Sequence, residues 1–456
     1  MQNYDIIWIG TGQATGTVVP KLSQAGKTVA IAEGGRFGGT CINYGCTPTK
    51  ALVASARAAH LVRRGADFGV DISDFDINFD TVMARHNNLR DKQSQGMQEW
   101  LGDLNGVELF TEFAQFEDEH TVSVGQERIT GDTIVINTGA RARQPQINGL
   151  DEVEWLDNKG VLDLKVLPHH LVIIGGSYIG MEFGQAFRRF GSAVTILEKG
   201  SQLMFREDAD IAKAARKILE NEDIAIHLET QIQGVAKTPN GVRVDVQRNG
   251  TAFSIEGSHL LVATGRQPNT DNLNLDAARI EQDKHGYIKV NDVVQTNVPH
   301  IYAVGDVNRH GAFTHTSVHD GQIFWDHYSG HGDRTLSERV PIYNMYIDPP
   351  LGRVGMSEKE ARQSERRILT AMRPMSRVSR AVEKDETAGL IKMFVDAETE
   401  EILGATILGV SGDEIISTIA AFMVTHQSYK VLQRAVLPHP TVAEILPWIL
   451  DDLQPL

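Results

Sequence analysis

A strand, a glycine-rich turn and a helix occur twice in this chain, and this repeat constrains the fold more than any other feature. The first copy is DIIWIGTGQATG, residues 5–16, and the second begins LVIIGGSYIGMEFG, residues 171–184. In each copy a short apolar run stops at glycines, which allow a tight turn and a pyrophosphate close to the start of the next helix. One copy alone indicates little, but two copies predict two dinucleotide-binding domains of the doubly wound α/β type.

The first copy carries most of the residue types that a dinucleotide site needs. Gly10, Gly12 and Gly16 lie in or beside the turn, while Thr15 takes the third small position and predicts a slightly altered packing of helix on strand. The run TVAIAEGG follows and places Glu33 roughly twenty residues beyond the turn, where a carboxylate can accept hydrogen bonds from ribose hydroxyls. This copy therefore predicts one bound dinucleotide.

The second copy repeats the pattern with one departure. Gly175 and Gly180 flank Ser177, which replaces the usual middle glycine, and Glu198 ends the strand that follows the helix. An acidic residue at this distance again favours a nucleotide with a free ribose hydroxyl. The alternative is that both copies are plain strand-helix-strand crossovers with glycine turns.

Three apolar segments outside the two copies are interpreted as strands that return to the nucleotide sites. GDTIVINTGA contains Thr138 and Gly139 and ends at Ala140, HLLVATGRQP contains Gly265, and TNVPHIYAVGDV contains Gly305 and Asp306 before its last valine. Apolar runs of this kind are typical of buried parallel strands. We expect the two Thr-Gly strands to pass near a cofactor and Asp306 to accept from a sugar or ribityl hydroxyl, although a turn residue is the alternative for Asp306.

The chain has only two cysteines, Cys41 and Cys46, directly after the first nucleotide-binding unit. Five residues of ideal helix rise about 7.5 Å, whereas the Cα atoms of a disulfide lie roughly 4.4–6.8 Å apart. A bridge therefore needs a bent first turn, to which Gly45 and Pro48 contribute. Such a strained loop favours a reducible bond over a structural one. Two unrelated buried thiols are the alternative, and a zinc site lacks further ligands.

Composition narrows the partners and the compartment. The chain has 44 basic and 59 acidic residues and a net charge of −15, which argues against nucleic acid or an anionic membrane surface and favours a small-molecule substrate. No apolar run approaches a membrane span, and the N-terminal segment is interpreted as a strand rather than a signal peptide. We therefore expect a cytoplasmic protein, in which a disulfide is more often catalytic than structural.

The last third of the chain changes character. From about Pro341 strands are followed by helices, which indicates a separate α+β domain. Within it, His439 lies between two prolines and Glu444 follows about one and a half helical turns later. This layout is typical of a general acid/base with an orienting carboxylate, and a rigid surface histidine is the alternative.

The chain resembles a known family over essentially its whole length. GGTCINYGCTPTK, the two glycine-rich units, IYAVGD and HPTVAE occur in the order found in FAD-dependent pyridine nucleotide-disulfide oxidoreductases, the family of glutathione reductase, dihydrolipoamide dehydrogenase and mercuric reductase. The resemblance implies two Rossmann-like dinucleotide-binding domains, for FAD and NAD(P), and a C-terminal α+β dimerisation domain. The implied segments are 1–147 and 268–335 for FAD binding, 148–267 for NAD(P) binding and 336–456 for dimerisation.

The resemblance also implies an electron path. NAD(P)H would reduce the flavin, and the flavin would reduce a disulfide between Cys41 and Cys46. Cys46 would be the flavin-proximal thiolate and Cys41 the interchange thiol, which agrees with the lower pKa of a thiol near a helix start and a base. His439, oriented by Glu444, would be that base and would act across the two-fold interface of a homodimer.

Further positions match family residues beside the two cofactors. Lys50 matches the lysine near flavin N5, Glu182 its ion-pair partner, and Tyr178 the aromatic that covers the nicotinamide pocket. Segment Phe313–Gly321 matches the helix whose start faces the flavin pyrimidine ring. The residues that we expect to contact the cofactors are Gly10, Gly12, Gly16, Glu33, Gly39, Thr40, Thr138, Gly139, Gly175, Tyr178, Gly180, Glu198, Gly265, Gly305, Asp306, Thr314 and His315.

The nucleotide and the acceptor are less constrained. Glu198 would repel a 2′-phosphate and favours NADH, whereas Lys199 and Arg206 could accommodate NADPH. A disulfide or thiol-reactive acceptor is the leading expectation. The alternatives are a mercuric reductase-type metal-ion reductase, although no cysteine follows Cys46, and a dihydrolipoamide dehydrogenase-like subunit of a larger complex. We expect no resident metal. We interpret the histidines at positions 310, 315, 319, 327 and 331 as helix surface and flavin-site packing, and a site for a soft or borderline metal is the alternative.

Overall fold

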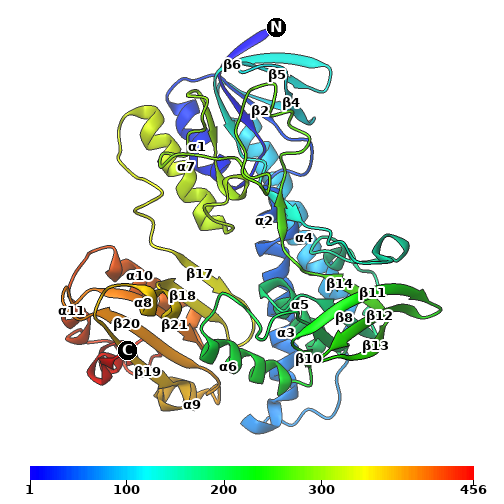
Figure 1. Ribbon diagram of the computed structural model, residues 1–456, viewed down its shortest axis with the longest axis vertical. Helices are drawn as coiled ribbons and strands as arrows, with labels where there is room; N and C mark the ends of the chain where they lie inside the picture. Colours follow the sequence, from blue (N-terminus) through cyan, green and yellow to red (C-terminus); the bar gives the residue numbers. More distant parts are fainter. The chain divides into compact units, whose positions relative to one another are not determined.

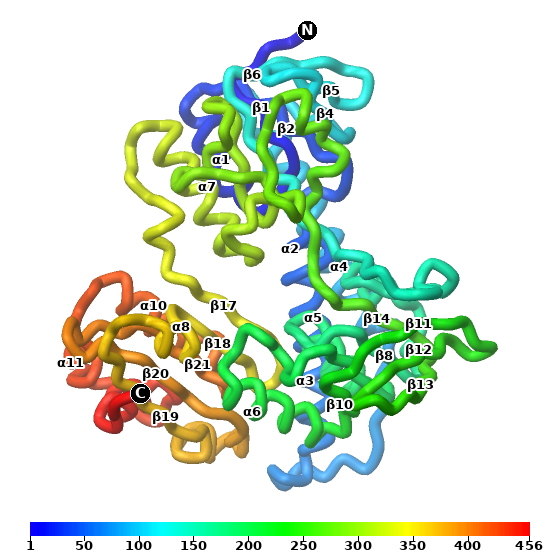
Figure 2. Tube along the Cα trace, in the orientation of Figure 1, coloured from blue at the N-terminus to red at the C-terminus, as the bar shows by residue number.

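The structure is a computed structural model that describes all 456 residues (Figure 1). The chain divides into two compact units, each assembled from segments that are far apart in the sequence. Unit 1 comprises residues 1–51, 80–144 and 264–339, and unit 2 comprises residues 52–79, 145–263 and 340–456. Figure 2 shows how the green-to-yellow segment that starts near residue 264 returns to the blue N-terminal strands of unit 1.

Unit 1 is built on a mostly parallel sheet with the order β3-β2-β1-β6-β5-β4, in which β16 also pairs with β6. The strands are β1 (Gln2–Ile9), β2 (Val29–Ala32), β3 (Val107–Phe110), β4 (Ala114–Phe116), β5 (Thr121–Val124), β6 (Glu127–Ile136) and β16 (Ile301–Ala303), with a separate pair β7 (Ala140–Ala142) and β15 (Arg266–Pro268). The helices and 3-10 turns are α1 (Gln13–Gln24), α2 (Gly39–Tyr44), α3 (Cys46–Arg63), α4 (Phe79–Gly102), η4 (Gly305–Asn308) and α7 (Thr314–Ser329). Helix α3 begins in unit 1 and continues into unit 2.

Strand β1 is buried on both faces because its side chains alternate between two cores. Ile6 and Trp8 pack with apolar residues of α1 and α7, whereas Ile7 and Ile9 pack on the other face with β4, β5 and residues 273–298. Helices α1 and α7 lie side by side on their face of the sheet (Figure 1). This double burial explains the continuous apolar run and fits a parallel sheet that is covered on both sides.

The nucleotide-binding part of unit 2 has a four-stranded parallel sheet with the order β10-β9-β8-β14 and an antiparallel three-stranded sheet β11-β12-β13. These elements are β8 (His170–Ile174), α5 (Tyr178–Phe190), β9 (Ala193–Leu197), α6 (Ala209–Glu220), β10 (Ala225–His227), β11 (Thr230–Thr238), β12 (Gly241–Arg248), β13 (Thr251–Gly257) and β14 (His259–Val262), with η1 (Gly65–Phe68), η2 (Leu150–Glu152) and η3 (Gly160–Asp163). In both units the strand order reverses at the strand that leads into the glycine turn, β1 or β8, and such reversals form ligand crevices.

The C-terminal part of unit 2 is an antiparallel sheet with the order β17-β18-β21-β20-β19-β22 and several helices. These elements are β17 (Ile342–Met345), β18 (Leu351–Gly355), α8 (Glu358–Gln363), β19 (Ile368–Pro374), η5 (Met375–Arg377), α9 (Ser379–Glu383), β20 (Leu390–Asp396), β21 (Ile402–Leu408), α10 (Gly412–Met423), α11 (Tyr429–Gln433), α12 (Ile445–Ile449), η6 (Leu450–Asp452) and β22 (Gln454–Pro455). The expected fold class, two Rossmann-like sheets and a C-terminal α+β domain, is confirmed. The exact limits of the four expected segments stay predictions.

No helix of the chain combines the length and the apolar composition that crossing a membrane requires.

Candidate active site

The glycine turn of unit 1 lies against Asn137, which directly follows β6. Gly10 has a φ of +92°, and a Cβ atom there would lie 2.6 Å from the Asn137 carbonyl oxygen. A Cβ atom on Gly12 would lie 2.7 Å from the Asn137 side-chain oxygen. Positions 10 and 12 therefore require glycine, and the two glycines leave the first N–H groups of α1 facing a ligand.

Thr15 completes the turn through its side chain. The residue is fully buried, and its hydroxyl accepts hydrogen bonds from Trp8 Nε1 at 2.8 Å and from Asn137 Nδ2 at 3.0 Å. The same hydroxyl lies 3.3 Å from the Gly10 carbonyl oxygen, to which it donates. Thr15, which replaces the usual small residue, therefore connects β1, the glycine turn and α1 through the hydrogen bonds of its hydroxyl. Sequence reasoning missed Trp8 and Asn137 because nothing local marks them as partners.

Glu33 lies at the end of β2, as expected. Its Oε2 accepts from the Thr11 backbone N–H at 2.9 Å and from the Thr11 hydroxyl at 2.6 Å, and its Oε1 accepts from the Gly35 N–H at 2.8 Å. The carboxylate is therefore fixed at the rim of the turn. Gly16 faces the Trp100 ring instead, at 3.6 Å from where a Cβ would lie.

The cysteine loop bends by ending one helix and starting another. Helix α2 ends at Tyr44 and α3 begins at Cys46, so Gly45 separates them. A Cβ atom on Gly45 would lie 2.9 Å from the Thr40 carbonyl oxygen and 3.3 Å from the Cys41 Cα atom. The bent turn that the cysteine spacing requires therefore depends on the absence of a side chain at Gly45.

Asn43, between the two cysteines, fixes this loop from beneath. It is fully buried, and its Nδ2 donates to the carbonyl oxygens of Phe37 at 2.9 Å and Gly39 at 3.0 Å. Its Oδ1 accepts from Arg36 Nε at 2.9 Å. Because these bonds use both ends of the amide, the backbone on either side of Cys41 is held in place.

One hydroxyl contacts both sulfur atoms. Thr314, the first residue of α7, donates to Cys41 Sγ at 2.9 Å, and its oxygen lies 3.3 Å from Cys46 Sγ. Both cysteines are present as free thiols. The hydrogen bond with Cys46 and burial raise the pKa of Cys41. Since Cys46 starts the long helix α3, a negative charge on the pair is favoured at Cys46.

The sulfurs lie at a groove of about 140 Å³ in unit 1. The groove brings together the starts of α1, α2, α3 and α7. Its lining includes the expected residues Gly12, Gly39, Thr40, Cys41, Cys46, Thr138, Gly139, Asp306 and Thr314, and also Gln13, Asn137, Arg266 and Ser317. Of the other expected residues, His315 stacks on Phe313 with ring centroids 5.5 Å apart, and Gly265 lies beside Arg143.

Polar atoms in this groove fit a flavin nucleotide. Thr138 Oγ1 and Arg266 Nε are buried without a hydrogen-bond partner. Asp306 forms an ion pair with Arg266 at 3.1 Å, and burial raises the pKa of its carboxyl group. Hydroxyl and phosphate groups of FAD would supply the missing partners. Sequence reasoning missed Arg266, which lies close in sequence to the expected Gly265.

Asp320 holds the loop that carries Asp306. Its Oδ2 accepts from the Gly305 N–H and from Asn308 Nδ2, each at 2.8 Å, and its Oδ1 pairs with Arg339. The side chain is 1% exposed, so this pairing is shielded from water. The hydrogen bond to Asp320 therefore fixes the backbone at Gly305. No sequence pattern marks Asp320 as its partner.

The glycine turn of unit 2 is equally crowded. A Cβ atom on Gly180 would lie 2.1 Å from the Gly175 carbonyl oxygen, and Gly175 itself has a φ of +112°. Glu198, at the end of β9, accepts from the N–H groups of Gly176 and Gly200, each at 2.7 Å. The expected glycines and acidic residue therefore lie together at the start of α5.

The remaining expected catalytic residues lie in three places. Lys50 is in the first turns of α3 in unit 1. Glu182 is buried in α5, where its Oε1 accepts from the Tyr346 N–H at 2.8 Å. His439 is exposed and its Nδ1 donates to Oε2 of the buried Glu444 at 2.8 Å. Helix α12 begins only after Glu444, so a loop rather than a helix joins this pair. The roles of all four residues stay predictions.

Known proteins share both the sequence and the fold of this chain. A profile of the family described as pyridine nucleotide-disulphide oxidoreductase matches residues 4–321, and one of its dimerisation domain matches residues 342–450. The chain is 35% identical to the probable pyridine nucleotide-disulfide oxidoreductase RclA of Escherichia coli, with 98% of each chain covered. It is 32% identical to a mercuric reductase of Lysinibacillus sphaericus, over 97% of this chain and 81% of that protein.

A solved structure gives the same result. The HOCl-induced flavoprotein disulfide reductase RclA from Escherichia coli superposes with a TM-score of 0.89 at 34% identity, over 98% of this chain and 99% of that chain. The chain therefore belongs to the pyridine nucleotide-disulphide oxidoreductase family and is a FAD-dependent NAD(P)H:disulfide oxidoreductase.

Proposed function

We propose that Cys41 and Cys46 form the redox-active disulfide of this enzyme, with Cys46 beside the flavin and Cys41 toward the acceptor. The observation that carries the proposal is the contact of one hydroxyl, on Thr314, with both sulfurs at the groove where α1, α2, α3 and α7 start. The raised pKa of Cys41 and the helix start at Cys46 support this division of roles. FAD would be held by the glycine turn, Asp306 and Arg266.

FAD, when bound, supplies the two-electron relay between a nicotinamide hydride and the disulfide. Reduction of the bond between the two sulfurs takes up one proton and leaves a thiolate on Cys46 and a thiol on Cys41. After losing its proton, Cys41 attacks one sulfur of a disulfide acceptor and releases the other sulfur as a thiolate. Cys46 then attacks Cys41, restores the internal disulfide and releases the second thiol product.

His439 of a second copy would move the protons in this exchange. Its Nδ1 is bonded to buried Glu444, which fixes the ring and leaves Nε2 on the exposed side. A homodimer would bring it to the sulfurs of the other chain. Six large apolar side chains of the matched dimerisation region are exposed, with Val436 97% exposed: Met372, Val382, Val424, Val431, Val436 and Trp448. A two-fold interface would bury these exposed side chains, and their exposure in the single chain supports the proposed dimer.

The acceptor would be a small disulfide or a thiol-reactive electrophile, and NADH the preferred donor. The carboxylate of Glu198 is fixed by two backbone N–H groups beside the glycine turn, where it would repel a 2′-phosphate. We propose a cytoplasmic location, because NAD(P)H is available there and the compartment is reducing.

Anaerobic titration with NADH tests the assignment of the two sulfurs. Two-electron reduction should give a long-wavelength charge-transfer band, because a Cys46 thiolate then lies beside oxidised flavin. Cys46→Ser should abolish the band. Cys41→Ser is the matched control and should show a band without added reductant, since its Cys46 cannot form the disulfide. A band that persists in Cys46→Ser would contradict the proposal. Turnover with small disulfides, lipoamide and glutathione disulfide, with NADH and NADPH, then ranks donors and acceptors.

A second candidate activity is the reduction of metal ions held by the two sulfurs. Several similar proteins are named mercuric reductase, and one solved structure is a Cu(II) complex of the Escherichia coli RclA flavoprotein. This chain has no cysteine after Cys46, so the ion would have to reach the pair directly. Oxidation of NADH stimulated by mercuric, cupric or auric ions and lost in Cys41→Ser would support this activity. Fast disulfide turnover without a response to these ions would reject it.

Purification as a free, active dimer would count against a role confined to a larger complex.

A further inference from the structure

Glu207 lies at the centre of a buried hydrogen-bond network in unit 2. Its side chain is 0% exposed. Oε1 accepts from the hydroxyls of Tyr178 and Tyr343, each at 2.7 Å, and Oε2 accepts from Arg353 at 2.7 Å. Arg353 is itself 3% exposed, so the ion pair is shielded from water. No sequence motif marks Glu207, which lies just before α6.

The four side chains join the nucleotide turn to the C-terminal sheet. Tyr178 is the first residue of α5, directly after the turn that carries Gly175. Tyr343 is in β17 and Arg353 is in β18, two neighbouring strands of the sheet that the dimerisation profile matches. Glu207 therefore connects the turn that would bind NAD(P)H with the domain that would form the dimer.

The charges of the network keep both phenols as donors. Burial and the negative charge of Glu207 raise the pKa of Tyr178 and of Tyr343. The two rings lie with centroids 5.8 Å apart and planes tilted by 41°. Displacement of the Tyr178 ring would break its charge-assisted hydrogen bond to Glu207. This displacement is costly in free energy, because the buried hydroxyl would then lack an acceptor.

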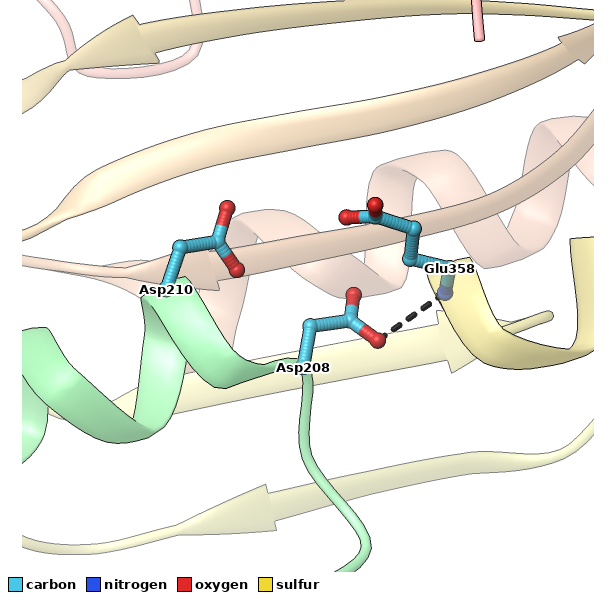
Figure 3. Close-up of side chains that lie close together, drawn as sticks. All are labelled: Asp208, Asp210 and Glu358. Carbon is cyan, nitrogen blue, oxygen red and sulfur yellow. Dashed lines mark hydrogen bonds between the residues drawn. The ribbon is translucent and has the colours of Figure 1, made fainter. Parts of the chain in front are cut away.

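The segment that carries Glu207 is fastened on both sides. Toward the nucleotide turn, the Met204 N–H donates to the Gly176 carbonyl oxygen at 2.9 Å. Toward the C-terminal sheet, the neighbouring Asp208 accepts from the Glu358 N–H at 2.9 Å (Figure 3). Hydrogen bonds therefore connect this segment both to the nucleotide turn and to the C-terminal part of unit 2.

The carboxylates drawn in Figure 3 provide a second tie rather than a metal site. Asp208, Asp210 and Glu358 could in principle surround a cation. Lys392 Nζ, however, lies 2.8 Å from Asp210 and 3.8 Å from Asp208 and also pairs with Glu358. Since this ammonium group supplies the positive charge, the cluster is an ion-pair junction between α6 and β20.

We propose that Glu207 is a positioning residue for NAD(P)H, which holds the Tyr178 ring through its hydroxyl while Arg353 of the C-terminal sheet holds Glu207. The dimerisation domain then sets the position of an aromatic ring beside the nucleotide turn. The inference rests on the proposed use of a nicotinamide nucleotide and on the place that the family resemblance implies for Tyr178, at the nicotinamide pocket.

The test measures how fast NADH reduces the flavin of the holoenzyme, under anaerobic stopped flow and over a range of NADH concentrations. The concentration dependence gives the Kd for NADH separately from the limiting rate. Tyr178→Phe removes only the hydroxyl and keeps the Glu207–Arg353 ion pair, so the fold is retained, which a thermal midpoint checks. We expect its Kd to differ from that of the wild type by roughly tenfold, the size of one charge-assisted hydrogen bond.

Glu207→Gln shows whether Glu207 acts through this hydroxyl. In the wild-type background, Glu207→Gln should shift the Kd for NADH in the same direction as Tyr178→Phe does. In the Tyr178→Phe background, the same substitution should change the Kd by less than about twofold. The comparison variant is Tyr343→Phe, which removes the other phenol from the same carboxylate oxygen. Because Tyr343 is in β17 and not in the nucleotide turn, its effect on the Kd should be clearly smaller than that of Tyr178→Phe.

Two results would overturn the inference: a wild-type Kd in Tyr178→Phe, or an equal effect of Glu207→Gln with Tyr or Phe at position 178. Failure of either nucleotide to reduce the wild-type flavin would instead contradict the proposed function.

Discussion

Replacement of Thr15 by alanine tests the account of the first glycine turn. The Thr15 hydroxyl accepts from Trp8 Nε1 and from Asn137 Nδ2, and all three residues are at most 3% exposed. Thr15→Ala leaves two donors buried without an acceptor. An unsatisfied buried donor costs about 1–3 kcal/mol, so the loss in folding free energy should be about 2–6 kcal/mol.

The change should be visible as earlier release of FAD on heating. Unit 1 has the size of an ordinary domain, in which 1 kcal/mol shifts the Tm by about 2–4 °C. We therefore expect the midpoint of flavin release, followed by flavin fluorescence, to fall by at least about 4 °C. The Kd for FAD should rise as well, because Asn137 also borders the groove in which we propose that FAD binds.

Thr15→Ser is the matched control. It keeps the hydroxyl and loses only a methyl group, so its flavin-release midpoint should lie much closer to that of the wild type. The reasoning is refuted if Thr15→Ala releases FAD within about 1 °C of the wild type, or if Thr15→Ser is as unstable as Thr15→Ala.

Three further substitutions probe other parts of the site. Thr314→Val removes a donor that lowers the pKa of Cys41, so the pH profile of disulfide reduction should move to higher pH by up to about one unit; an unchanged profile would contradict the contact. Gly180→Ala would place a methyl group 2.1 Å from a carbonyl oxygen of the turn, and reduction by NADH should be lost while the bound-flavin spectrum remains; normal reduction would show that α5 can shift. Arg353→Met leaves the Glu207 carboxylate buried without its counter-ion and should cost about 3–5 kcal/mol in urea unfolding, whereas a wild-type midpoint would show that the ion pair is dispensable.

Local sequence patterns predicted the parts of the site whose residue types are set by the backbone. Gly10 and Gly175 have positive φ angles, and Gly180 faces a carbonyl oxygen, so a glycine at such a position is itself the signal. Gly45 is a similar case, because a bridge between the two cysteines at this spacing needs a bent turn and a Cβ atom at Gly45 would crowd Thr40 and Cys41. The structure also brings His439 and Glu444 into contact on a loop, and their catalytic roles stay predictions.

The side chains that support these positions could not be predicted in this way. Asn137 lies 122 residues from Thr15, and Arg353 lies 146 residues from Glu207. A buried polar residue looks the same in a sequence whether its partner is water, backbone or a distant side chain. Only the folded chain shows which donor meets which acceptor.

The sequence by itself determined the class of this protein: two glycine turns, a cysteine pair and a C-terminal α+β region, because each depends on short-range geometry within a few residues. The tertiary structure decided how these pieces are held for function. It joined Thr314 to both sulfurs, Asn137 to Thr15 beside the first glycine turn and Glu207 to Tyr178 beside the second. Such contacts form between segments brought together by burial of apolar strands, and a hydrogen bond across them depends on distances that no local pattern encodes.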